Sequence, residues 1–214
     1  MQPLARGEYR VERGHFYGTP KEVYAFRWDA GLRTPRAIAA RFCAVHEDPL
    51  GLEGLRTPTR LPEAKVLHSL GAVHVIWQQH HLGKRVHRAY VTVHIDRQNV
   101  VYLAKNRAVP KVHLPKEFSR KIDAHEALEL AGDIMKTDAA HSAKIGVHER
   151  LWYPWKDRLL PAIKIRLEIH APRRRECIVY VDAHNGRARV ETQRSPGGRS
   201  ARAQSPDIAS CRVS

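Results

Sequence analysis

The sequence predicts an α+β protein of two small modules, each a helix packed on an antiparallel β-sheet, followed by a disordered C-terminal tail. Three observations carry this prediction: two segments with helical apolar spacing, two groups of strands with period-two alternation, and a last stretch with few core formers. The chain has 214 residues and is 43% hydrophobic, enough for packed cores. We place the modules at residues 1–110 and 111–193 and the tail at 194–214.

The first module begins with a strand and a helix. Alternation of side chains over residues 23–28 predicts a short strand. Thr34 is a good N-cap residue and Pro35 suits the first helical position. Apolar residues recur at helical spacing from Ile38, and Pro49 is expected to end the helix.

A three-stranded antiparallel meander follows. Residues 73–80 alternate with period two, and Gly83 can supply the positive φ of a tight turn. Residues 86–96 form a second long strand, 97–99 a turn, and 100–104 a third strand.

The second module is predicted as a helix followed by an antiparallel sheet. Residues 105–121 read as a basic linker, after which Asp123 can cap a helix with Glu126 three residues later. Asn185-Gly186 after a strand is a strong hairpin signal. The predicted strands are 146–153, 162–170, 177–182 and 187–193.

The charge of the chain favours acidic partners. It has 37 Lys and Arg against 22 Asp and Glu, a net charge of +15. No apolar run is long enough to span a bilayer, so we expect no membrane partner, and no signal-peptide core is visible. The localisation therefore stays open. Cys43, Cys177 and Cys211 are too widely spaced for a zinc motif or a disulfide framework.

Thermolysin-type catalysis needs two His one helical turn apart, with a Glu beside the first, to hold zinc and activate water. Three His-Glu pairs occur, at His46, His125 and His148. The positions that would need the second His hold Leu50, Glu129 and Trp152. We therefore expect no catalytic residues of this type, and no enzyme activity.

The 14 histidines invite a metal-site hypothesis. His74 and His80 share one strand face, and His87 could lie across the hairpin, but no carboxylate or Cys joins them at ligand spacing. Surface histidines on strands are the favoured interpretation, so we expect no metal and no cofactor. His94, near the end of its strand beside Asp96, is predicted to be structural.

Nucleic-acid binding is the alternative function. The basic linker 105–121 and the run 173–175 supply positive charge, and Trp152, Tyr153 and Trp155 could stack on bases. The basic residues are dispersed and no named nucleic-acid motif is present, which favours a solvated basic surface.

Two segments resemble a known kind of pro-region. Residues 71–96 resemble the FTP motif in the propeptides of thermolysin- and fungalysin-type zinc metallopeptidases. That motif consists of a strand that ends in Gln, a turn that contains Gly, and a Val followed by a strand that ends near His and Asp. Residues 151–186, with the helix from Asp123, are similar to a PepSY domain. The resemblance covers roughly residues 15–192 and includes no catalytic domain.

This resemblance implies a non-catalytic pro-region that inhibits a secreted zinc metallopeptidase and assists its folding. The partner would be a thermolysin-like catalytic domain, which is joined in cis in the family and would be bound in trans here. A truncated or frameshifted protease precursor is the alternative within this class. The family-motif and interface candidates are Gln79, Gly83, Val86, His94, Trp155, Pro161, Asp182 and Gly186.

Overall fold

The fold is known from a computed structural model, which describes residues 4, 8–14, 18–55, 61–62, 64–135, 143–169 and 175–193. Within these residues it has ten strands, two α-helices and one 3₁₀ helix, so the chain is a mixed α/β protein as predicted. The tail predicted at 194–214 lies outside the described residues.

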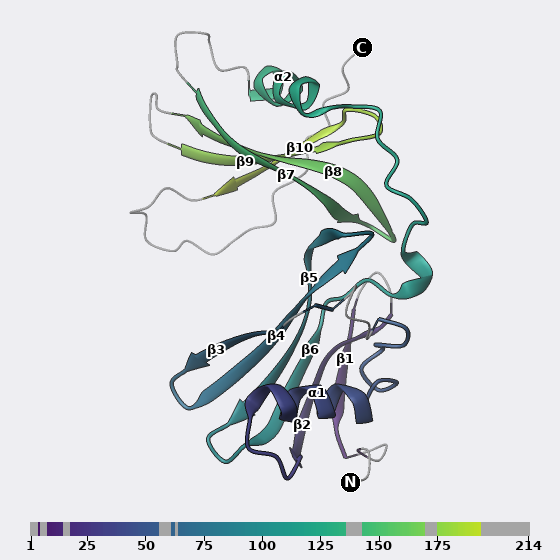
Figure 1. Ribbon diagram of the computed structural model, residues 1–214, viewed down its shortest axis with the longest axis vertical. Coiled ribbons are helices and arrows are strands. Elements are labelled where there is room, and N and C mark those ends of the chain that lie inside the picture. Colours follow the sequence, from purple (N-terminus) through teal and green to yellow (C-terminus); the bar gives the residue numbers. More distant parts are fainter. Residues whose placement is uncertain are drawn as a thin grey trace. The chain divides into compact units, whose positions relative to one another are not determined.

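The chain folds as two compact units (Figure 1). The N-terminal unit comprises residues 1–116 and 154–159, and the C-terminal unit comprises residues 117–153 and 160–214. The predicted modules divide after residue 110, whereas the main division between the units follows Lys116.

The N-terminal unit is built on a six-stranded antiparallel sheet in the order β1-β2-β6-β5-β4-β3. The strands are β1 (Arg10–Arg13), β2 (Pro20–Asp29), β3 (Lys65–Ser69), β4 (Ala72–His81), β5 (Lys84–Asp96) and β6 (Val100–Asn106). The predicted meander, now β4 to β6, is confirmed. The sequence did not predict β1 and β3, whose residues are almost all exposed and lack a buried alternating face.

Helix α1 (Pro35–Val45) lies across one face of this sheet (Figure 1). Thr34 occupies the N-cap position with an extended backbone, φ −100°, although its side chain makes no capping hydrogen bond, and Pro35 stands in the first turn, as predicted. The helix ends at Val45, earlier than the expected stop at Pro49, and residues 46–51 continue as turns.

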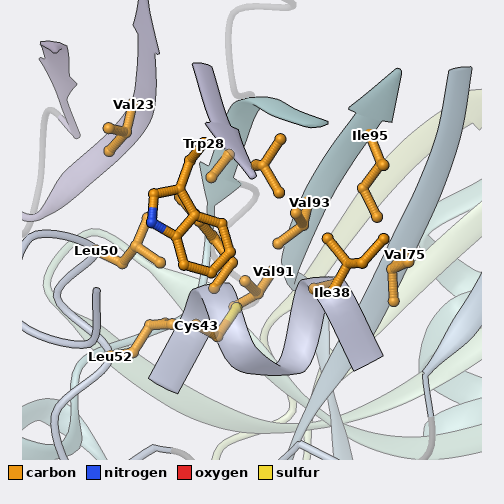
Figure 2. Close-up of a cluster of buried hydrophobic side chains, with 14 of the residues drawn as sticks. Val23, Trp28, Ile38, Cys43, Leu50, Leu52, Val75, Val91, Val93 and Ile95 are labelled. Carbon is orange, nitrogen blue, oxygen red and sulfur yellow. The ribbon is translucent and has the colours of Figure 1, made fainter. Parts of the chain in front are cut away.

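The core of the N-terminal unit fills the space between α1 and the sheet (Figure 2). Phe42 is fully buried, stacks on Phe26 at 5.5 Å between ring centroids and meets Trp28 edge-on at 5.4 Å. The sheet contributes fully buried aliphatic side chains from β4, β5 and β6, which are Val75, Val91, Val93, Ile95 and Val101. Period-two alternation along these strands places the apolar side chains on the face that α1 covers.

The C-terminal unit packs one helix on a four-stranded sheet in the order β7-β8-β9-β10. Its elements are α2 (Ala124–Met135), β7 (Ala143–Trp155), β8 (Arg158–Ile169), β9 (Arg175–Asp182) and β10 (Ala188–Gln193), except that the last two residues of β7 and the first two of β8 belong to the N-terminal unit. Asp123 caps α2 as predicted, since its Oδ1 accepts hydrogen bonds from the backbone N–H of His125 (2.8 Å) and Glu126 (2.9 Å). Ala127 and Ala131 of α2 belong to the same buried cluster as the aliphatic side chains of β8 and β9.

Candidate binding face and histidine pair

Gln79 is fully buried and ties β4 to the segment that follows β6. Its Nε2 donates to the carbonyl of Val109 at 2.9 Å, and its Oε1 accepts from the N–H of Val109 at 2.8 Å. The side-chain amide thus satisfies both backbone groups of one buried residue, as a neighbouring strand would. Gln79, one of the motif residues found in the sequence, therefore stabilises the fold of the N-terminal unit.

Further buried polar side chains anchor the predicted linker. Asn106 donates to the carbonyl of Leu50 at 2.7 Å and accepts from the N–H of Ala108 at 2.8 Å. The Nε2 of His81 donates to the carbonyl of Pro115 at 2.5 Å. The linker therefore follows a defined path along the N-terminal unit up to Pro115.

His46, one of the histidines in the His-Glu pairs, is buried at the C-terminal end of α1. Its Nδ1 donates to the carbonyl of Phe42 at 2.9 Å, and its Nε2 accepts from the N–H of Leu4 at 3.1 Å. One ring nitrogen donates and the other accepts, as in the neutral imidazole. Burial lowers the pKa of His46 from 6.5, and this effect outweighs the hydrogen bond to Phe42, which raises it.

Three predicted site residues meet at the turn between β9 and β10. The N–H of Ala183 donates to the carbonyl of Pro161 at 2.8 Å, and the N–H of Gly186 donates to the carbonyl of Asp182 at 2.9 Å. Asp182 is buried, and its Oδ1 accepts from the N–H of His184 at 2.8 Å. This turn holds β8, β9 and β10 together.

Gly186 cannot be replaced without strain. Its φ is +71°, and a Cβ atom there would lie 2.9 Å from Cδ1 of Ile122 and 3.1 Å from Cδ1 of Leu130. Gly83, at the tip of the β4–β5 hairpin, has a similar φ of +70° but no atom within 4 Å of such a Cβ. The first glycine is required by packing and conformation, the second by conformation alone.

The other predicted positions are separate from these. Val86 is fully buried in β5, and Trp155 is half-buried at the end of β7. Trp152, a stacking candidate in the nucleic-acid hypothesis, is buried. Within the N-terminal unit, Gln79, Gly83, Val86 and His94 lie at different points of the β4–β5 hairpin, and within the C-terminal unit Pro161, Asp182 and Gly186 meet at one turn.

A continuous row of side chains crosses the sheet of the N-terminal unit on the face opposite α1. Leu67 of β3 pairs with His74 of β4, His74 with His94 of β5, His94 with Leu103 of β6, and Leu103 with Tyr24 of β2. Directly paired residues of antiparallel strands project from the same face, so these five form the open-face row.

The two ends of the open-face row are apolar and accessible. Leu67 is 40% exposed and Tyr24 is 39% exposed. Next to Tyr24 the pairing of β2 with β6 is interrupted, and the sheet has a hollow of about 610 Å³ there. Its lining is Tyr24, Ala25, Phe26, Arg27, Tyr102 and Leu103.

The centre of the open-face row is a hydrogen-bonded histidine pair. The Nδ1 atoms of His74 and His94 are 2.7 Å apart, and the Nε2 of His74 is 2.7 Å from the Oγ of Ser69. The Nε2 of His94 is buried and has no hydrogen-bond partner among the residues that the structure describes.

The surroundings of His94 favour its neutral form. Its pKa is lowered from 6.5 to about 4, mainly by burial, then by the nearby His74 and Lys105, with Glu22 acting in the opposite direction. Lys105 is itself paired with Glu22 at 2.9 Å. His94 was predicted to be structural, but its pairing with His74 was not foreseen.

In the described parts of residues 4–193, no group of three His, Cys, Asp or Glu side chains could hold a metal ion. None of the helices described is long and apolar enough to cross a membrane. No protein-family model and no curated protein sequence matches this chain.

Proposed function

We propose that this chain is a non-catalytic pro-region that binds the catalytic domain of a thermolysin- or fungalysin-type zinc metallopeptidase, inhibits it and assists its folding. The proposal starts from the resemblance of residues 71–96 to the FTP motif and of residues 151–186 to a PepSY domain, in the order expected of such pro-regions. A role of this kind requires a complementary surface rather than reactive side chains.

The observation that carries the proposal is the open-face row. A sheet face that presents accessible Leu67 at one end and, at the other end, Tyr24 on a wide-open hollow of about 610 Å³ suits the docking of another protein. Apolar anchors that fill pockets supply most of the binding energy in such interfaces.

The net charge of +15 defines the partner further. An acidic catalytic domain would be attracted at long range, which raises the association rate at low ionic strength. The same charge would attract nucleic acid, which stays the alternative.

The test uses the full chain and a thermolysin-type peptidase encoded in the same genome. We expect inhibition of the mature peptidase at micromolar concentrations of the chain and a higher yield when the denatured peptidase refolds in its presence. Leu67→Glu and Tyr24→Glu place a charge on the open-face row and should weaken inhibition by about tenfold or more, since desolvating an unpaired charge is unfavourable.

Val190→Glu is the matched control, because Val190 is also 40% exposed on a strand but belongs to the C-terminal unit. It should leave inhibition unchanged. The proposal fails if the unsubstituted chain neither binds, inhibits nor refolds the peptidase. A mobility shift with DNA or RNA that weakens steeply with salt, with no effect on the peptidase, would support the alternative instead.

A further inference from the structure

We propose that His74 and His94 form a binding site for a divalent transition-metal ion that prefers imidazole ligands, with Cu²⁺ bound most tightly. The two residues lie directly opposite each other on neighbouring strands, and their Nδ1 atoms are 2.7 Å apart. This site lies at the centre of the open-face row, but metal binding there can be tested without a peptidase.

The separation of the two nitrogens is close to that of two ligands of one metal ion. Two imidazole nitrogens, each about 2.0–2.1 Å from a metal, are about 3 Å apart when they occupy neighbouring coordination positions. The Nδ1 atoms of His74 and His94 must therefore separate by only a few tenths of an ångström, with rotation of the rings. Both residues lie inside strands that pair over many residues, so the backbone already holds them in place.

The outer contacts of His74 resemble those of a metal ligand. A ligating imidazole ordinarily donates its other ring N–H to a nearby oxygen, which fixes its orientation and tautomer. The Oγ of Ser69 donates to the carbonyl of Ala72 at 3.3 Å and so can accept from the Nε2–H of His74 at 2.7 Å. This arrangement leaves the Nδ1 lone pair of His74 directed at the site.

His94 can provide the second lone pair. In the absence of metal its Nδ1–H donates to the Nδ1 of His74, and its Nε2 carries a lone pair without a partner in the described residues. When a metal binds, the proton moves from Nδ1 to Nε2 of His94, so the ring stays neutral, and the Nε2–H, unlike that of His74, has no acceptor among the described residues. No proton is released to solvent in this step.

Charge around the pair permits a cation. The positive charge of Lys105 acts on His94, and the ion pair of Lys105 with Glu22 at 2.9 Å reduces the repulsion of a bound cation.

The ligand atoms determine which ions bind. Imidazole nitrogen suits Cu²⁺, Ni²⁺ and Zn²⁺, and the usual affinity order places Cu²⁺ first. Mg²⁺ and Ca²⁺ require oxygen ligands and should not bind at the pair. Water fills the coordination positions that the two histidines leave open.

The experiment titrates the full chain with Cu²⁺, and separately with Zn²⁺ and Mg²⁺, by calorimetry. Electron paramagnetic resonance of the first equivalent of Cu²⁺ reports how many imidazole nitrogens it binds. We expect one strongest site with two nitrogens. His74→Ala and His94→Ala should each weaken it at least tenfold and leave a one-nitrogen spectrum. His68→Ala, an exposed histidine on the neighbouring strand β3, should change neither.

A circular dichroism spectrum establishes that each variant folds, and His74→Gln replaces His74→Ala if the alanine variant does not. The electron paramagnetic resonance spectrum of Cu²⁺ bound to the unsubstituted chain tests the proposal without any variant. A strongest site with one nitrogen ligand, or with three or more, overturns the proposal. So does a strongest site that survives both substitutions, because it would then lie at other histidines.

Discussion

Replacing Gln79 with Met tests whether this motif residue supports the fold or a partner interface. The substitution keeps the length of the side chain but removes its hydrogen bonds of 2.9 and 2.8 Å to the carbonyl and N–H of Val109. Val109 is 1% exposed, so water cannot replace these contacts. Each buried backbone group left unpaired costs about 1–3 kcal/mol, which predicts a loss of about 2–6 kcal/mol in the free energy of unfolding for the two groups.

Urea denaturation followed by tryptophan fluorescence measures this loss, and amide hydrogen exchange at Val109 locates it. We expect the midpoint of the N-terminal unit to fall and the exchange of the Val109 amide to accelerate. Gln98→Met is the control, because Gln98 is exposed in the β5–β6 turn and its loss should cost no more than about 0.5 kcal/mol. If Gln79→Met unfolds at the same midpoint as the unsubstituted chain while its Val109 amide stays protected, the role assigned to Gln79 is wrong.

Two further predictions concern the stability of the units. Gly186→Ala should destabilise the C-terminal unit by about 2–4 kcal/mol, because the cost of the positive φ and the cost of the close contact add. Gly83→Ala should destabilise the N-terminal unit by only about 1–2 kcal/mol, because only the positive φ is unfavourable there. Equal losses of stability in urea denaturation would contradict this. The lowered pKa of His46 means that the unfolded chain takes up a proton more readily than the folded one. Stability contributed by the neutral ring is complete above pH 6.5 and is lost as the pH falls below it. His46→Leu should therefore make the decline in the urea midpoint between pH 7 and pH 5 shallower, and an unchanged decline would refute the assignment.

Much of the fold follows from local patterns in the sequence. The helix from Pro35, the meander of β4 to β6, the cap at Asp123 and the hairpin at Asn185-Gly186 each depend on residues close together in the chain. These signals were sufficient because the residues that determine them are neighbours in the sequence.

The edges of the N-terminal sheet were not predictable in this way. Strands β1 and β3 are short and mainly exposed, so neither carries the alternating apolar signal that reveals a strand. They form because β2 and β4 present unpaired backbone groups to them. These two strands therefore form only when the rest of the sheet is assembled.

The histidine pair shows the same limit. His81 pairs with Lys84 across the β4–β5 turn, and an uninterrupted hairpin of that register would place His74 opposite Val91. An irregularity near Gln79 and Arg88, where φ is +52°, shifts the pairing so that His74 meets His94 instead.

The sequence by itself therefore determined the fold class, both helices and the central meander, because local spacing and capping encode them. Only the tertiary structure decided which residues share the open-face row. The register of two strands beyond a bulge depends on how the buried face of each strand packs against α1. A change of register by an odd number of residues moves each side chain of one strand opposite residues that would otherwise lie on the other face of its partner. The candidate docking face and the proposed metal site both follow from that shift.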